Sequence, residues 1–94
     1  MIEETLAIRN KLGIHLRPAE KIAQTANAFA SGVSLRNGSC QVNGKSILGM
    51  LALEAGFGCR VHVIVEGPDE GEAMAAIRAL IEGGFGEEMG DPEA

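Results

Sequence analysis

Two strand-like segments flank an Asn-Gly pair in the stretch Val33-Ser34-Leu35-Arg36-Asn37-Gly38-Ser39-Cys40-Gln41-Val42. Asn-Gly between two short strands is the strongest local signal for a β-hairpin, because a type I′ turn needs positive φ at both central residues. The two strands of a hairpin are antiparallel. The stretch therefore predicts an antiparallel sheet with a turn centred on Asn37-Gly38.

Helical patterns lie on both sides of this hairpin. Before it, apolar residues from Pro18 to Ala30 recur at the spacing of one helix face, and Ser31-Gly32 ends the pattern. After it, Ser46 is a good N-cap for a short, very apolar helix over residues 47–53. A buried strand over 47–53 is the alternative that periodicity leaves open.

The outer segments complete the order of elements. Thr5–Ile8 is predicted as a first strand, and Arg60–Val65 as a strand that presents Val at every second position. Asp69 can cap a last helix, which Gly83-Gly84 ends. The order β-α-β-β-α-β-α predicts an α+β domain with an antiparallel sheet and a helical layer. We expect one domain over residues 1–94, with a flexible tail over 86–94.

Composition narrows the class of protein. The 94 residues are 46% hydrophobic and 22% charged, which fits one globular domain. No apolar run approaches the roughly 18 to 20 residues of a membrane span, and the acidic N-terminus is unlike a secretory signal. Cys40 and Cys59 lie far apart and show no metal-ligand spacing. We therefore expect a cytoplasmic protein with reduced thiols, no metal, no cofactor and no membrane insertion.

Charge is unevenly distributed along the chain, which has a net charge of −5. Residues 1–65 hold seven basic and four acidic residues, whereas residues 66–94 hold one basic and nine acidic residues. This asymmetry indicates either a solvated acidic helix and tail, or a basic face for an acidic partner or phosphate. The acidic total and the absence of Trp and Tyr disfavour nucleic-acid binding.

His15 lies where a phosphoryl group could be handled. It follows the loop Lys11–Ile14 and precedes a helix whose first turn contains Arg17. Free amides and the dipole at a helix start attract an anion, and a guanidinium can bond two phosphate oxygens. A neutral imidazole is a nucleophile at physiological pH. The alternative is an exposed polar residue or cap, and His62, in mid-strand, is expected to have no special role.

Two motifs carry a family resemblance. Gly13-Ile14-His15-Leu16-Arg17-Pro18-Ala19 closely resembles the active-site signature of HPr, the histidine-containing phosphocarrier of the bacterial phosphoenolpyruvate phosphotransferase system, whose usual pattern is Gly-hydrophobic-His-Ala-Arg-Pro-Ala. Asn43-Gly44-Lys45-Ser46-Ile47-Leu48-Gly49 resembles the family's regulatory-serine region. The similarity runs from Thr5 to Phe85. It implies an open-faced β-sandwich, a four-stranded antiparallel sheet covered on one face by three helices, with His15 as the cap of the first helix.

The resemblance also implies roles for residues. His15 accepts a phosphoryl group, through Nδ1 in the family, from phosphorylated enzyme I and passes it to IIA components of sugar permeases. Arg17 steadies the phosphate. Ser46 corresponds to the residue that HPr kinase/phosphorylase modifies in many relatives, although a plain N-cap serine is the alternative. The expected partner-binding residues are Leu16, Lys21, Lys45, Ile47, Leu48 and Leu51.

Leu16 departs from the family pattern, since Ala is usual beside the reacting ring. The larger side chain would narrow partner choice or shield the phosphohistidine from water. Two other functions stay open. The chain could be the nitrogen-related paralogue in a regulatory phosphorelay, or a regulatory binding module that relays no phosphate.

The sequence offers no groups for independent turnover. It shows no metal cluster, no paired carboxylate near His15 and no nucleotide loop, since Gly56-Phe57-Gly58 is too short. The chain is therefore predicted to be a monomeric carrier on which other enzymes act, and not itself an enzyme.

Overall fold

The computed structural model describes residues 1–91 and confirms the predicted order of elements. Its strands and helices are β1 (Ile2–Ala7), α1 (Leu16–Asn27), β2 (Gly32–Asn37), β3 (Cys40–Asn43), α2 (Ile47–Ala52), β4 (Arg60–Glu66), α3 (Glu70–Glu82) and a final 3₁₀ turn, η1 (Gly84–Gly86). Residues 47–52 form the predicted helix and not the alternative strand. No helix within residues 1–91 has the length and apolar character needed to cross a membrane.

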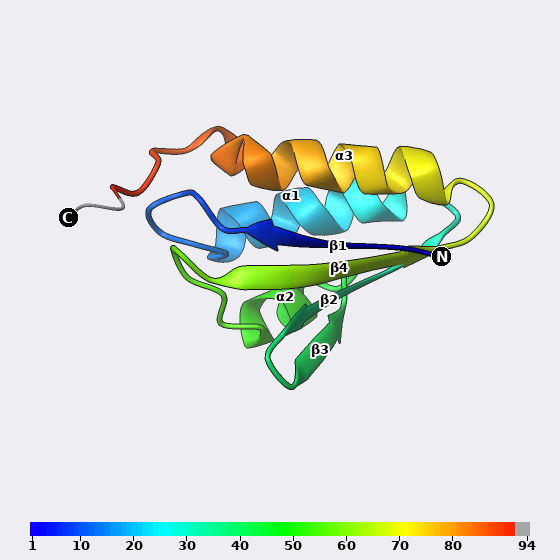
Figure 1. The fold of residues 1–94 in the computed structure, drawn as a ribbon, viewed down its shortest axis with the longest axis horizontal. Helices are drawn as coiled ribbons and strands as arrows, with labels where there is room; N and C mark the ends of the chain where they lie inside the picture. The colour runs from blue at the N-terminus through cyan, green and yellow to red at the C-terminus, as the bar shows by residue number, and fades with distance from the viewer. Residues whose placement is uncertain (92–94) are drawn as a thin grey trace.

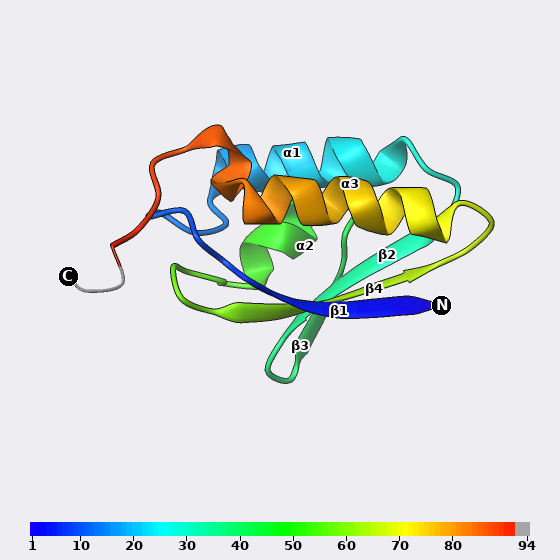
Figure 2. The same ribbon diagram turned by 45° about the horizontal axis from the view of Figure 1, so that its top comes forward.

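One antiparallel sheet in the order β1-β4-β2-β3 forms the base of the molecule. The central strand β4 pairs its Val63 with Glu4 of β1 on one side and Leu35 of β2 on the other. Successive side chains of a strand point to opposite faces, so Val61, Val63 and Val65 are all buried under the helices. The three helices lie on one side of the sheet (Figure 2), and α1 and α3 run side by side (Figure 1). The expected open-faced β-sandwich is confirmed.

The core confirms the predicted helix stripe but shortens the helix. Ala19, Ile22 and Ala26 of α1 are fully buried. The helix ends at Asn27 and not at Ala30, because the N–H groups of Ala28 and Phe29 bond carbonyls three residues back and not four. The N–H groups of Ala30 and Ser31 each donate to the Asp69 carboxylate at 2.9 Å. Asp69 is the N-cap residue of α3, as predicted. Its side chain accepts these bonds from the turn after α1 and makes no capping bond.

The hairpin forms with a different turn from the one predicted. Asn37 pairs with Cys40, so the two central residues are Gly38 and Ser39. Gly38 has a φ of 62°, and Asn37 and Ser39 are not among the non-glycine residues with positive φ within residues 1–91. The prediction of a type I′ turn on Asn37-Gly38 is therefore wrong. Glycine in the first central position fits a type II′ turn.

The C-terminal segment, residues 84–91, returns along the loop between β1 and α1. Met89 forms a β-bridge with Asn10. The N–H of Lys11 donates to the carbonyl of Glu88, and the N–H of Gly90 donates to the carbonyl of Arg9, both at 2.8 Å. Residues 86–91 of the tail that we expected to be flexible include those that make these bonds, and residues 92–94 lie outside the described part. The segment therefore reaches the loop that carries His15.

An ion pair between β1 and α3 leads to a pH-dependent stability. Arg78 Nε donates to Glu4 Oε1 at 2.8 Å, and its Nη2 donates to the other carboxylate oxygen. This bonding lowers the pKa of Glu4 below its ordinary value of 4.5. A carboxyl with a lower pKa in the folded state contributes stability that is complete above the ordinary value and is lost as the pH falls through the folded pKa.

We expect Glu4→Gln to lower the free energy of unfolding most at neutral pH, and the difference from the wild type to shrink in acid. Urea unfolding at neutral pH and at several pH values below the ordinary pKa of Glu4 checks this. A difference that stays constant down to the most acidic pH would contradict the ion-pair assignment.

Candidate functional site

His15 is the N-cap residue of α1, as the family resemblance implied. Its backbone is extended, and its side chain makes no capping hydrogen bond, so the imidazole is free for other contacts. The loop before it is fixed by Gly13, whose φ is +68°. A Cβ there would lie 2.6 Å from Ala55 O and Gly56 Cα, and the N–H of Ile14 donates to Ala55 O at 2.8 Å. Close packing against residues 55–56 thus positions His15.

The first turn of α1 supplies free amides beside this imidazole. The N–H of Ala19 already bonds the carbonyl of His15 at 3.0 Å, and Pro18 has no N–H. The N–H groups of Leu16 and Arg17 have no acceptor within the helix, because they belong to its first turn. The helix dipole adds about half a positive charge at this end. The Arg17 side chain is exposed here, so amides and guanidinium can both meet an anion.

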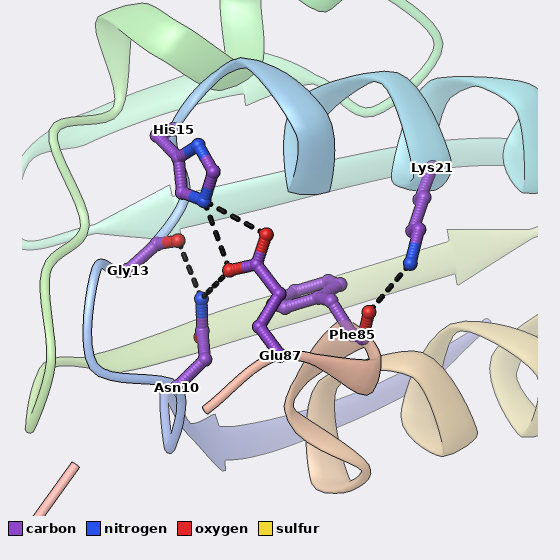
Figure 3. Close-up of polar contacts among 6 residues, drawn as sticks. All are labelled: Asn10, Gly13, His15, Lys21, Phe85 and Glu87. Carbon is purple, nitrogen blue, oxygen red and sulfur yellow. Dashed lines mark hydrogen bonds and ion pairs between the residues drawn. The ribbon is translucent and has the colours of Figure 1, made fainter. Parts of the chain in front are cut away.

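The carboxylate of Glu87 contacts the His15 ring, and the sequence did not indicate this contact. His15 Nε2 lies 2.9 Å from each oxygen of the Glu87 carboxylate (Figure 3). The side chains are 38% and 20% exposed, so the pair is accessible at one edge. The hydrogen bond from His15, with a smaller contribution from Asn10, lowers the pKa of Glu87 below its ordinary value of 4.5. Glu87 is therefore an ionised acceptor at neutral pH.

Three consecutive left-handed residues bring Glu87 to this position. Gly84, Phe85 and Gly86 have φ of 63°, 58° and 74°. For Phe85 this conformation is strained, but its ring is buried and its carbonyl accepts a hydrogen bond from Lys21 Nζ of α1. The chain thus turns back after α3 and presents Glu87 to His15 (Figure 3).

The predicted partner-binding residues surround the site to different degrees. Leu16, Ile47 and Leu48 are 55%, 38% and 80% exposed, which is unusual for large apolar side chains. Leu51 is half-buried and packs against the core. Lys45 is also half-buried, and its Nζ donates to Phe29 O at 3.0 Å. Both lysines predicted to steer a partner, Lys21 and Lys45, are thus hydrogen-bonded to backbone carbonyls of the chain.

Ser46 is the N-cap of α2, as predicted. Its Oγ accepts a hydrogen bond from the N–H of Gly49 at 3.0 Å, and the N–H of Met50 bonds its carbonyl at 3.0 Å. The side chain is half-buried at the edge of the exposed apolar residues Ile47 and Leu48. Ser46 therefore has a structural role whether or not it is modified.

We expect Ser46→Ala to destabilise the protein by about 1 kcal/mol, because it removes the capping acceptor of a six-residue helix. Ser46→Asp keeps an acceptor and should retain most of that stability. Chemical denaturation measures both variants, and equal unfolding free energies for wild type and Ser46→Ala would refute the capping role.

The second histidine has a different setting. His62 lies on β4, on the face of the sheet away from the helices. Its Nδ1 is 3.1 Å from Thr5 Oγ1, and its Nε2 is 2.8 Å from Glu3 Oε1. These are cross-strand contacts between β1 and β4, away from any helix start. His62 provides a natural control for experiments on His15.

Residues 1–91 offer no alternative centre for metal chemistry. No set of three or more His, Cys, Asp or Glu side chains there is arranged to hold a metal ion. Both cysteines are free, Cys40 exposed and Cys59 half-buried. The chemistry of the site thus depends on the His15 imidazole, the helix amides, Arg17 and Glu87.

Comparison with known proteins agrees with this geometry. Residues 2–83 match the family model described as the PTS HPr component phosphorylation site. The chain belongs to the HPr family. The phosphocarrier protein HPr of Treponema pallidum is 42% identical over 88 residues, which cover 94% of this chain and all of that protein. The crystal structure of an HPr from Thermoanaerobacter tengcongensis is 44% identical, with a TM-score of 0.89 and coverage of 94% of this chain and 99% of that one.

Paralogues within the HPr family are similar as well. The phosphocarrier protein NPr of Escherichia coli is 38% identical over 88 residues, covering 93% of this chain and 98% of that protein. The HPr and NPr relatives thus differ little in their identity to this chain.

Proposed function

We propose that this member of the HPr family carries a phosphoryl group on His15, receives it from phosphorylated enzyme I and passes it to IIA components of the phosphotransferase system. The observation that carries the proposal is the imidazole at the N-cap of α1, half-exposed and not used for capping, beside the free amides of the first turn and Arg17. The family match over residues 2–83 includes this position.

The transfer is an in-line displacement at phosphorus. The lone pair of His15 Nδ1 attacks the phosphoryl group on enzyme I, so that the bond from Nδ1 to phosphorus forms as the bond from phosphorus to enzyme I breaks. Charge on the moving phosphoryl oxygens is balanced by the first-turn amides and by Arg17. Transfer to IIA is the same step in reverse with a different acceptor. Positioning and charge balance carry most of such a reaction.

The exposed apolar side chains Leu16, Ile47 and Leu48 suit a brief contact with each partner. A carrier must leave one protein and meet another, which favours a small interface over a tight one. Phosphorylation of Ser46 by an HPr kinase would add about two negative charges beside these residues and weaken docking to an acidic partner. We propose further that this carrier acts as a monomer in the cytoplasm.

A second candidate is the nitrogen-related branch of the family. The 38% identity to NPr of Escherichia coli is close to the 42% identity to HPr of Treponema pallidum. The two branches differ in the IIA protein that receives the phosphoryl group. Competition between a sugar-type and a nitrogen-type IIA protein for the phosphorylated chain distinguishes them.

Incubation with phosphoenolpyruvate and enzyme I tests the carrier role. We expect the intact mass to rise by one phosphoryl group, and the added mass to disappear on brief acid treatment, because an N–P bond hydrolyses in acid and a serine ester does not. A chain that gains no phosphate under conditions that phosphorylate an HPr of known activity would be a binding module and not a carrier.

A further inference from the structure

We propose that Glu87, held by the buried Asn10, is a positioning residue that keeps the proton of the neutral His15 ring on Nε2 and so leaves the lone pair on Nδ1. The proposal rests on the phosphocarrier function proposed for His15. It adds the C-terminal segment to the functional site and assigns to Glu87 the choice of the reacting nitrogen.

The contact with Glu87 determines which ring nitrogen of His15 carries the proton. An ionised carboxylate has only acceptors, so a nitrogen that contacts both its oxygens must be the donor. His15 Nε2 lies 2.9 Å from both Glu87 oxygens and therefore carries a proton. A neutral imidazole has one proton, which leaves Nδ1 unprotonated. Nδ1 is on the opposite edge of the ring from Glu87 (Figure 3).

Asn10 fixes the position of the Glu87 carboxylate. Asn10 is fully buried, and its Nδ2 donates to Gly13 O at 2.7 Å and to Glu87 Oε1 at 3.1 Å. Both neighbours are acceptors, so the amide must present its NH₂ group and not its oxygen. Its own Oδ1 has no hydrogen-bond partner within residues 1–91, which costs stability. In this orientation the Asn10 amide binds both the loop that carries His15 and the Glu87 carboxylate.

The backbone before Glu87 brings its side chain to the site. The left-handed turn of Gly84, Phe85 and Gly86 directs the chain toward His15. A Cβ at Gly84 would lie 2.5 Å from Met89 Sδ, so the turn and the following residues are closely packed. The Lys21 bond to Phe85 O and the bridge of Met89 to Asn10 fix both sides of Glu87.

The carboxylate also helps the transfer itself. As Nδ1 forms its bond to phosphorus, the ring develops positive charge that is shared with Nε2–H. A carboxylate at Nε2–H stabilises that charge, as the aspartate of a Ser-His-Asp triad stabilises its imidazolium. Glu87 stays on the edge away from the phosphoryl group, so it assists the ring without contacting phosphate.

The test compares Glu87→Ala and Glu87→Gln with Glu88→Ala, an exposed carboxylate of the same segment. We expect Glu87→Ala to lower the rate of phosphoryl transfer from enzyme I about tenfold, with KM changed less than about twofold, because the docking surface is intact. Glu87→Gln retains an uncharged hydrogen-bond acceptor, so its transfer rate should lie between those of Glu87→Ala and the wild type. It also keeps the test valid if Glu87→Ala folds poorly. Glu88→Ala should match the wild type.

Ring-¹⁵N NMR of the unphosphorylated protein provides a readout that does not depend on enzyme I. The wild type and Glu88→Ala should show the Nε2–H form of His15, and Glu87→Ala should show a mixture of both forms. Transfer rates of both Glu87 variants within about twofold of Glu88→Ala, or an unchanged proton position in Glu87→Ala, would overturn the role of Glu87. A wild-type chain that accepts no phosphate would instead overturn the carrier function.

Discussion

Replacement of His15 by Ala is expected to abolish phosphorylation by phosphoenolpyruvate and enzyme I, because no other side chain of the site has a nitrogen lone pair that can take the phosphoryl group. The fold should remain, since the His15 side chain is half-exposed and makes no capping bond. Loss of the bond to Glu87 should change the free energy of unfolding by about 1 kcal/mol. Intact mass after treatment with the donor measures the phosphate, and chemical denaturation measures the fold.

His62→Ala is the matched control for this experiment, since it removes the only other histidine in the chain. Its contacts are with Thr5 and Glu3 on the sheet, so it should accept phosphate as the wild type does. Acid-labile phosphate that persists in His15→Ala, or its loss in His62→Ala alone, would show that the acceptor is misassigned.

Arg17→Ala is expected to keep the acceptor but slow phosphoryl transfer about 100-fold, which corresponds to about 2.7 kcal/mol. The guanidinium can bond two oxygens of the moving phosphoryl group, and the first-turn amides alone would balance less of its charge. Arg17→Lys keeps the positive charge but loses the paired hydrogen bonds of the guanidinium. Its transfer rate should therefore lie between those of Arg17→Ala and the wild type. Stopped-flow or quench-flow measurement of transfer from phosphorylated enzyme I gives these rates.

Arg36→Ala controls for the loss of one exposed positive charge. Arg36 lies on β2 between the buried Leu35 and the turn, and its side chain is exposed. Its replacement should leave the transfer rate within about twofold of the wild type. Equal rates for Arg17→Ala and Arg36→Ala would exclude Arg17 from the transfer step.

Short-range patterns predicted most of the fold. The Val61, Val63 and Val65 alternation gave β4, and the spacing of Ala19 to Ala26 gave α1, because burial on one face leaves a period in the sequence. The N-cap at Ser46 could be predicted because capping needs only a hydroxyl and an amide three residues later. His15 and Arg17 could be proposed as site residues from the sequence because they lie within seven consecutive residues that resemble the family motif.

The position of the hairpin turn could not be predicted from such patterns. The observed turn lies on Gly38-Ser39, whereas the predicted turn lay on Asn37-Gly38. Both pairings of the two strands leave Leu35 and Val42 on the same face, so the alternation of apolar and polar residues cannot distinguish them. The observed register also lets the N–H of Gly44 bond Val33 O at 2.7 Å beyond the end of the strand pair. This bond depends on where the chain goes after β3.

The contact between Glu87 and His15 was even less accessible to prediction from the sequence. Glu87 lies 72 residues from His15 in the sequence, and their contact depends on a turn in which Phe85 adopts a conformation that sequence patterns assign to glycine. Acidic residues after α3 resemble a solvated tail when only local composition is considered. The one local sign is the run of glycines around Phe85, which indicates a sharp turn without saying where the chain goes next.

The most direct test of the account is to locate the phosphorus on the ring. A sample labelled with ¹⁵N in its histidines and phosphorylated by phosphoenolpyruvate and enzyme I can be examined for coupling between ³¹P and each ring nitrogen. We predict coupling to Nδ1 of His15, with the proton still on Nε2 beside Glu87. Phosphorus on Nε2 of His15, or on any other residue, would contradict it.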